Sequence, residues 1–454
     1  MTEGGYAERF ESRDQIKNRW KRCAQRRAHL APGEGFRIST DAHAARAPWP
    51  RRVLSGQADF LRLCHAGLII YIVRWLEMLA IAIFVYQRTH SPFLVTMMTL
   101  LRLLPMGLFG AQIGALAERM ERRSALIAVV AAMMACSASL ALLALSGHLP
   151  IWPLAIASLT GGIGWATDNP VRRVMLGEVA GSKRLGMAMS LDVALSNVSR
   201  MIGPVLGGAI FATLGMSGVF LLSVVLYATA LVAMLSLRAR NADTLPAAAT
   251  RRGHLREGFA LVRRDRRLVG ILLITVLYNL FGWPFTSLVP VIGAGTLHLD
   301  PRAVGLLAGM DGLGAFLGAL VLAAVLRPRH YARIYVGGLI GYLTMVIAFA
   351  LLHHPVPAGL ALLAEGFLGA GYSVMQATLI YQAAPPGMRA RLLGMLSVAI
   401  GMAPIGLLHI GLLASVFGAP TAVLISAIEG LAALALTWPL WRTVMTVPTG
   451  GATP

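Results

Sequence analysis

Residues 62–86 read RLCHAGLIIYIVRWLEMLAIAIFVY, a run long enough to cross a lipid bilayer as one helix. The run is mostly apolar, yet two charged residues, Arg74 and Glu77, stand close to its middle. Backbone groups inside a bilayer must find hydrogen bonds within the protein, and at this length only a helix provides them. The stretch therefore predicts a transmembrane helix and an all-α membrane protein.

Further runs of the same kind follow along the 454-residue chain. The composition agrees, because 57% of the residues are hydrophobic and 13% are charged, about half the charged share of a soluble domain. Each crossing needs about 20 apolar residues, and reading the chain for such runs predicts twelve spans. They are residues 62–86, 93–115, 125–146, 151–171, 186–211, 217–238, 268–291, 303–326, 334–353, 358–382, 392–416 and 419–441.

Basic residues separate the two kinds of loop between these spans. Even-numbered loops carry clusters such as Arg327, Arg329 and Arg333, whereas odd-numbered loops offer only Arg88 and Arg302. Loops rich in Lys and Arg stay in the cytoplasm. We therefore expect a multi-pass protein of the bacterial inner (cytoplasmic) membrane with both termini cytoplasmic.

The twelve spans form two sets of six that echo one another. Ser91-Pro92 opens the second span as Asp300-Pro301 opens the eighth. We therefore predict two pseudo-symmetric six-helix bundles, with the substrate site between them near the midplane. The predicted domains are a basic, disordered cytoplasmic tail (1–58), an N-terminal bundle (59–238), a cytoplasmic linker (239–267), a C-terminal bundle (268–441) and a cytoplasmic tail (442–454). A translation start near Val53 is the alternative reading of the first segment.

The remaining composition argues against other classes of protein. Cys23, Cys64 and Cys136 lack metal-ligand spacing, and the glycines lie within apolar runs and not in a phosphate-binding loop. The net charge of +20 is explained by basic residues at span ends, so we expect no nucleic-acid partner. We expect no enzymatic activity, no cofactor and no metal. The expected partner from composition is the lipid bilayer, with the chain a monomer; a small-molecule substrate and protons as coupling ion are expected only from the motifs that follow.

A short motif after the second span combines glycine, an acid and paired arginines. It runs from Gly114 through Glu118, Arg119, Arg122 and Arg123. It resembles the major facilitator signature G-x-L-a-D-R-x-G-R-R, with Glu118 where that family has Asp. We expect a charge latch that holds a neighbouring helix end in one conformation and releases it in the other. Arginines that only set topology are the alternative.

A second motif lies in the fifth span. Gly203-Pro204-x-x-Gly207-Gly208 resembles the G-P-x-x-G-G signature of proton-coupled antiporters within the same superfamily. Small residues at this spacing let helices approach closely, so tight packing is the competing explanation.

Other segments resemble the branch of enterobactin exporters and macrolide-efflux-like proteins. The resemblance includes Ser91-Pro92, Arg102-x-x-Pro105, Asp168-Asn169-Pro170-x-Arg172 and Asn197-x-x-Arg200. It implies proton-coupled efflux of a siderophore, drug or similar amphipathic metabolite by alternating access. Import of a small organic solute by proton symport, or a non-transporting membrane sensor, are the alternatives.

Charged residues fall at similar depth in several spans, where each is costly and needs a partner. At about 1.5 Å of rise per residue, Arg74, Glu77, Arg102 and Arg200 share one layer. We expect Glu77 to pair with Arg200 or Arg102, with Arg74 also in reach. The pair serves either proton coupling or structure.

The second set of spans adds two acids to this layer. Asp311 stands at the same offset from Asp300 as Arg102 from Ser91, so one wall of the cavity is expected to be cationic and the other anionic. Glu365 is a further coupling candidate, and Asp168 and Arg172 are assigned to a cytoplasmic gate. The candidates for lining the substrate cavity are Tyr71, Trp75, Asn279, Trp283, Tyr372 and Gln376.

Overall fold

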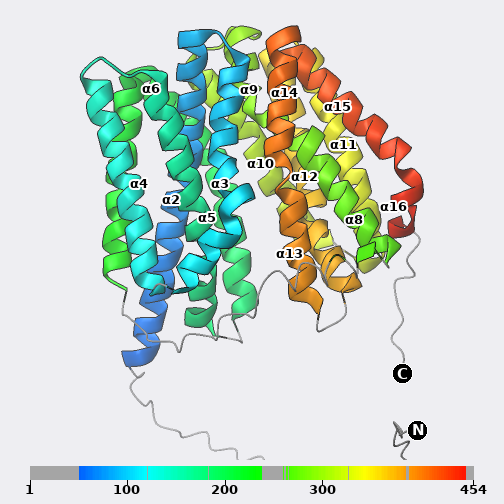
Figure 1. Cartoon of the computed structure of the whole chain (residues 1–454), viewed down its shortest axis with the longest axis horizontal. Coiled ribbons are helices and arrows are strands. Elements are labelled where there is room, and N and C mark those ends of the chain that lie inside the picture. Colours follow the sequence, from blue (N-terminus) through cyan, green and yellow to red (C-terminus); the bar gives the residue numbers. More distant parts are fainter. Residues whose placement is uncertain are drawn as a thin grey trace, which may run out of the picture. The chain divides into compact units, whose positions relative to one another are not determined.

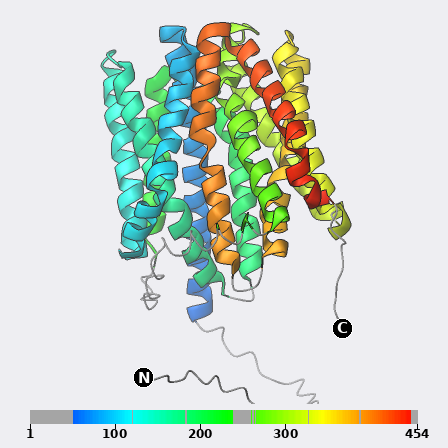
Figure 2. The same ribbon diagram turned by 45° about the vertical axis from the view of Figure 1, so that its right-hand side comes forward.

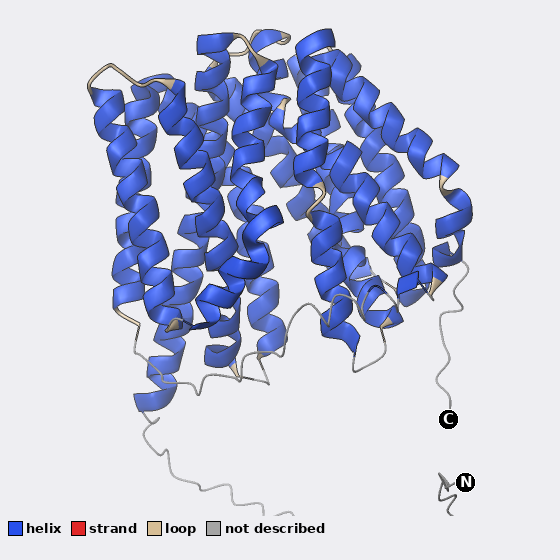
Figure 3. Ribbon diagram, in the orientation of Figure 1, coloured by secondary structure: helices blue, strands red, loops and turns tan. Residues whose placement is uncertain are grey.

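The computed structural model describes residues 51–119, 121–181, 184–237, 259, 262–263, 265–325, 327–384 and 388–445. Within these ranges all regular structure is helical (Figure 3). Residues 1–50 of the predicted tail 1–58 lie outside the described residues. Most of the linker 239–267 and of the tail 442–454 lies outside them as well.

The first helix group extends from Arg51 to Leu235 (Figure 1). Its first helix begins at Arg51 and therefore includes the last residues of the predicted tail. The group consists of α2 (Arg51–Thr89), α3 (Pro92–Arg119), α4 (Arg122–Leu145), α5 (Ile151–Ala180) and α6 (Leu185–Leu235).

Helix α6 contains two segments that run in opposite directions. The backbone leaves helical geometry at Gly215, whose φ of 64° and ψ of −161° suit a residue without a side chain. Gly207 packs on Leu76 of α2, yet Thr229, further along α6, contacts His65 nearer the start of α2. The chain therefore turns back at Gly215, which matches the two spans predicted at 186–211 and 217–238.

The second helix group extends from Arg266 to Met445 (Figures 1 and 2). Its first helical segment, from Arg266 to Gly295, is irregular. Tyr278–Gly282 forms a turn of π-helix and Trp283–Ser287 a 3₁₀-helix, in which Pro284 has no N–H group to donate to a backbone carbonyl. The elements are α8 (Arg266–Leu277), η1 (Tyr278–Gly282), η2 (Trp283–Ser287), α9 (Val289–Gly295), α10 (Pro301–Val325), η3 (Pro328–His330), α11 (Tyr331–Leu351), α12 (Pro355–Ala383), α13 (Arg389–Ile400), α14 (Ala403–Phe417), α15 (Ala419–Leu436) and α16 (Trp438–Met445).

Nine helices in the described ranges are long and apolar enough to cross a membrane. Helix α6 is one of the nine, although it contains two antiparallel segments. Helix α5 is not among them. Helix α3 is not among them either, but its stretch Pro92–Gly107 is a shorter apolar helix. The number of twelve spans therefore remains a prediction.

The most extensive contacts between the two groups involve three helix pairs, α6 with α10, α3 with α14, and α2 with α9, and α3 also touches η2. Glycines make these approaches close. A side chain at Gly208 would collide with the carbonyl of Pro301, and one at Gly411 would collide with Thr96. All three contacts lie between the middle of the helices and the end of the molecule where Thr89 lies.

The two groups also repeat one internal packing feature. Gly162 of α5 lies against the carbonyl of Arg102 in α3, and Gly366 of α12 lies against the carbonyl of Asp311 in α10. Arg102 and Asp311 are the residues that the sequence places at matching positions of the repeat, so their backbones have matching surroundings.

Candidate functional site

The charge pair of the first group joins α2 to α3. The Arg102 Nη2 atom lies 3.6 Å from Oε2 of Glu77, and the Ser137 hydroxyl of α4 donates to Oε1 at 2.8 Å. Both charged side chains are buried, with 4% and 10% of their surfaces exposed. Of the two partners expected for Glu77, the structure places Arg102 beside it. Ser137 was missed, because a lone serine in an apolar run carries no signal.

A second pair connects the two helix groups. Nη2 of Arg200 in α6 lies 2.7 Å from Oδ2 and 3.0 Å from Oδ1 of Asp311 in α10. The acid expected on the second wall at Asp311 therefore faces an arginine of the opposite group in this conformation. Its equivalence to Arg102 in the repeat predicted the depth of Asp311 in the membrane. It did not predict which side chain of the opposite group would pair with it.

Glu365 of α12 lies beside this second pair. Its side chain is fully buried, and neither carboxyl oxygen has a hydrogen-bond partner within the described residues. Arg200 acts on it electrostatically, and Asp311 and the Tyr342 hydroxyl lie close to its carboxyl group without reaching full hydrogen-bond geometry. A desolvated carboxyl group is costly when charged, so burial here favours the neutral form.

Arg74 has surroundings of a different kind. Its guanidinium lies 3.6 Å from the ring centre of Trp165 and 5.2 Å from that of Trp75. Among the residues described, no carboxylate lies at ion-pair distance from Arg74, so the expected approach to Glu77 is absent. Trp165, which follows a glycine-rich stretch of α5, was not among the residues expected at this site.

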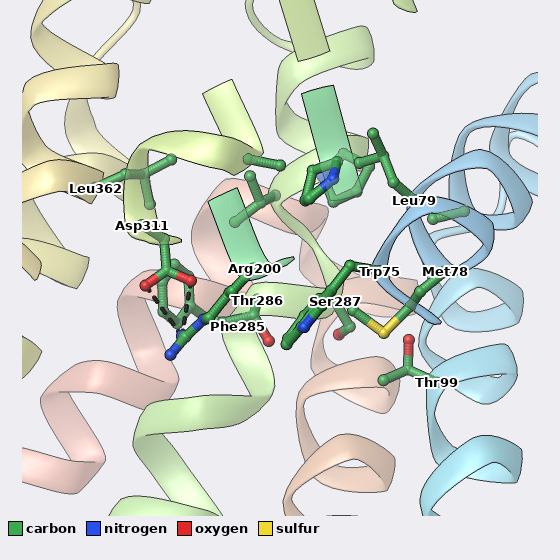
Figure 4. A pocket seen from close by; sticks show the side chains of 15 residues that line it. Trp75, Met78, Leu79, Thr99, Arg200, Phe285, Thr286, Ser287, Asp311 and Leu362 are labelled. Atoms are coloured by element: carbon green, nitrogen blue, oxygen red, sulfur yellow. Dashed lines mark hydrogen bonds and ion pairs between the residues drawn. The ribbon is translucent and has the colours of Figure 1, made fainter. Parts of the chain in front are cut away.

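A small cavity lies between the helix groups beside the second pair (Figure 4). It offers about 40 Å³ to water-sized molecules, far below the several hundred Å³ of a drug-sized site. The cavity must therefore widen to hold such a molecule. Its lining comes from both groups: Trp75, Met78, Leu79, Ala82, Thr99, Arg200, Pro204, Phe285, Thr286, Ser287, Val289, Pro290, Ala308, Asp311 and Leu362.

Of the six cavity candidates, only Trp75 lines this cavity. Tyr372 stacks between Tyr278 and Tyr335, at ring distances of 4.2 and 5.1 Å, and accepts a hydrogen bond from Gln376. These residues form a packed cluster inside the second group.

The other three candidates also lie outside the lining. Asn279 donates to the carbonyl of Thr275, and Trp283 is half-buried beside Pro284. Tyr71 is buried at the gate cluster, where it contacts Asp192 at 3.4 Å.

The gate residues gather around Arg172. Its Nη1 lies 2.7 Å from Asp192 of α6 and its Nε lies 3.1 Å from Asp168 of its own helix, while Arg173 binds Asp192 at 2.7 Å. Arg172 is fully buried and also lies over the ring of Tyr71. The structure therefore brings together the Asp168 and Arg172 of the predicted gate.

The loop motif is only partly described. Arg122 pairs with Glu178 at the end of α5, and Arg123 donates to the carbonyl of Leu235 at 2.7 Å, which caps the last turn of α6. The side chains of Gly114, Glu118 and Arg119 lie outside the described part of the chain.

The glycines of the Gly203–Gly208 motif face two neighbours. Side chains at Gly203 and Gly207 would collide with the Trp75 side chain and the Leu76 backbone of α2, whereas one at Gly208 would meet α10. The motif therefore lets α6 pack at once on its own group and on the opposite group.

Known proteins with similar sequences are membrane transporters. A family model described as "Transmembrane secretion effector" matches residues 55–446. Macrolide efflux protein A of Streptococcus pyogenes is 22% identical over 54% of this chain and 61% of its own length. The Staphyloferrin A transporter of Staphylococcus aureus is 23% identical over 78% of this chain and 89% of its own.

Solved structures share the fold at low sequence identity. A bacterial homologue of the human lysosomal transporter Spinster, in an inward-facing and unoccupied conformation, has a TM-score of 0.69 at 15% identity, covering 87% of this chain and 99% of its own. A mutant of the nucleoside transporter NupG has a TM-score of 0.67 at 12% identity, covering 84% of this chain and 100% of its own. With its family match over most of its length, the chain belongs to the transmembrane secretion effector family, in the macrolide-efflux-like branch of the major facilitator superfamily.

Proposed function

We propose that the protein is a secondary active transporter that exports an amphipathic small molecule in exchange for protons. The observation that carries this proposal is the Arg200–Asp311 pair, which joins the two helix groups at the edge of the cavity between them. An ion pair across a moving interface exists in one conformation and is broken in the other, which is what alternating access requires.

The proposal includes a twelve-span arrangement with both termini in the cytoplasm. On this reading α6 supplies two spans, and the end of the molecule at Thr89 faces outward. The contacts between the groups lie at that end, so the described conformation is closed to the outside. Export then begins with substrate entering from the cytoplasmic side or the inner leaflet.

Glu365 is proposed as the proton carrier. Its buried, unpartnered carboxyl group is stable when neutral, and loss of the proton adds a negative charge beside Asp311 and Arg200. Arg200 of the first group then faces two carboxylates of the second group. The protonation state of Glu365 therefore changes the strength of the attraction between the groups.

The Arg172 cluster is proposed as the cytoplasmic gate. Arg172 ties α5 to α6 through Asp192, and Arg122 holds the loop after α3 to the end of α5. These pairs lie within the first group, so they hold together its cytoplasmic end, and the gate opens and closes as this end moves relative to the second group. The names of the macrolide efflux relatives and of the family support export as the direction.

The test compares cells that lack the gene and carry either the wild-type protein, Asp311→Asn or Gly186→Ala. Untargeted mass spectrometry of supernatants and cell extracts is expected to find one compound secreted with wild type and Gly186→Ala, and retained inside cells with Asp311→Asn. Gly186 is the matched control because a side chain there meets no other atoms. Depletion of a compound from the medium by wild type would reverse the direction, and identical profiles in all strains would contradict transport.

A further inference from the structure

We propose that Arg74 binds an anionic group of the transported molecule, so that the substrate is an amphipathic anion. This inference rests on the proposed function and adds to it the chemical class of the substrate. It comes from the charges of the central layer, the unpartnered donors within it and the aromatic contacts of the Arg74 guanidinium.

Two of the three arginines in this layer have an acid beside them, and Arg74 does not. Arg102 is paired with Glu77, and Arg200 is paired with Asp311 and lies near Glu365. Arg74 has no acidic partner among the residues described, and the charged side chains that act on it are two other cations, Arg102 and Arg200. A cationic substrate would meet this excess positive charge, whereas an anionic one would complete a third pair.

The charged layer also contains buried donors without partners. The Nε atoms of Arg74, Arg102 and Arg200 lack hydrogen-bond partners in the described structure, and so does the indole Nε1 of Trp165, whose ring contacts Arg74. The unpartnered acceptors of the layer, the two oxygens of Glu365, lie near Arg200. A buried donor without a partner is costly, so a ligand rich in acceptor oxygens is stabilised here.

Two tryptophan rings contact the guanidinium. Its Cζ atom lies 3.6 Å from the ring centre of Trp165 and 5.2 Å from that of Trp75. Contacts of this kind use the face of a guanidinium and leave the N–H groups of its edge free for a carboxylate, phosphate or sulfonate. The aromatic rings supply apolar area for the rest of the ligand.

Arg74 also lies next to the cavity. Trp75 lines the cavity while its ring contacts the guanidinium of Arg74, and the Arg200 guanidinium lies 5.7 Å from the same ring. A molecule that enters the widened cavity and displaces Trp75 reaches Arg74 directly.

The test uses three probes that share one ring and differ in charge: 1-naphthaleneacetate, 1-naphthalenemethanol and 1-naphthylmethylammonium. Binding to the full-length protein in lipid nanodiscs is measured by calorimetry. We expect the anion to bind at least about tenfold more tightly than the other two. In Arg74→Gln that preference is lost, and in Arg74→Lys, which keeps the charge, part of it remains.

Arg88→Gln is the matched control, because Arg88 is an exposed arginine of the same helix at its far end. Its anion affinity is expected to equal that of wild type. Equal binding of the three probes, no binding of the anion, or unchanged anion affinity in Arg74→Gln would overturn the inference. The secretion experiment stands apart: export that persists in Arg74→Gln cells refutes the anion site and leaves the transporter proposal intact.

Discussion

The two arginine–carboxylate pairs of the central layer differ in what they join. Arg102 and Glu77 belong to one helix group, and 4% and 10% of their side chains are exposed. Arg200 and Asp311 belong to opposite groups, line the cavity, and are more exposed at 21% and 12%. The first pair is retained whichever way the groups move, whereas the second breaks when they separate. In the proposed mechanism, similar chemistry therefore serves stability at one position and conformational control at the other.

The largest effect on stability is expected for Glu77→Gln. The change leaves Arg102 buried without its counter-charge, which costs about 3–5 kcal/mol of folding free energy for a buried pair. Thermal unfolding of the purified protein checks this, and Glu77→Gln combined with Arg102→Gln is expected to recover part of the loss. A stable Glu77→Gln protein that no longer transports would instead place this pair in the coupling mechanism.

Two glycine substitutions separate packing within a group from packing between groups. Gly162→Ala forces α5 away from α3, and Gly208→Ala forces α6 away from α10. Overpacking of this kind costs about 1–3 kcal/mol. We expect Gly162→Ala to lower the unfolding temperature. Gly208→Ala is expected to favour the conformation with separated groups and to lower the unfolding temperature less.

The two glycine variants are compared by their limited-proteolysis patterns and their unfolding temperatures, with Gly186→Ala as the control. If Gly162→Ala and Gly208→Ala lowered the unfolding temperature equally and left the proteolysis pattern unchanged, the distinction between the two interfaces would be lost.

The smallest effect on stability is expected for Glu365→Gln. Glutamine keeps the shape of the side chain and removes its proton exchange, so the fold is retained while transport stops responding to the proton gradient. Export at several external pH values, compared with wild type, measures this response. A pH dependence unchanged from wild type would remove Glu365 from the coupling step.

The sequence predicted depth in the membrane better than direction around a helix. Counting residues along the spans placed Arg102, Glu77 and Arg200 in one layer, and the structure brings them there. Which arginine meets Glu77 depends on the rotation of each helix about its axis, so that choice stayed open. The same lack of information about helix rotation explains the error for Tyr372 and Gln376. They were expected to line the cavity, yet their side chains point into a packed cluster.

Neutral residues around the charges escaped the sequence analysis. Ser137 and Trp165 complete the surroundings of Glu77 and Arg74, but serine and tryptophan are ordinary in membrane helices. The break at Gly215 was anticipated only as a gap between two spans, whereas its positive φ comes from the structure.

The most direct test of the account measures whether the Arg200–Asp311 pair holds the groups together. Spin labels replace Arg88 and His298, which are exposed on opposite groups at the Thr89 end, in a protein whose three cysteines are changed to serine. Electron–electron resonance in nanodiscs gives the distance between them. The account predicts a short distance in the parent protein and in Glu77→Gln, and a longer one in Asp311→Asn. The same distance in Asp311→Asn as in the parent would contradict it.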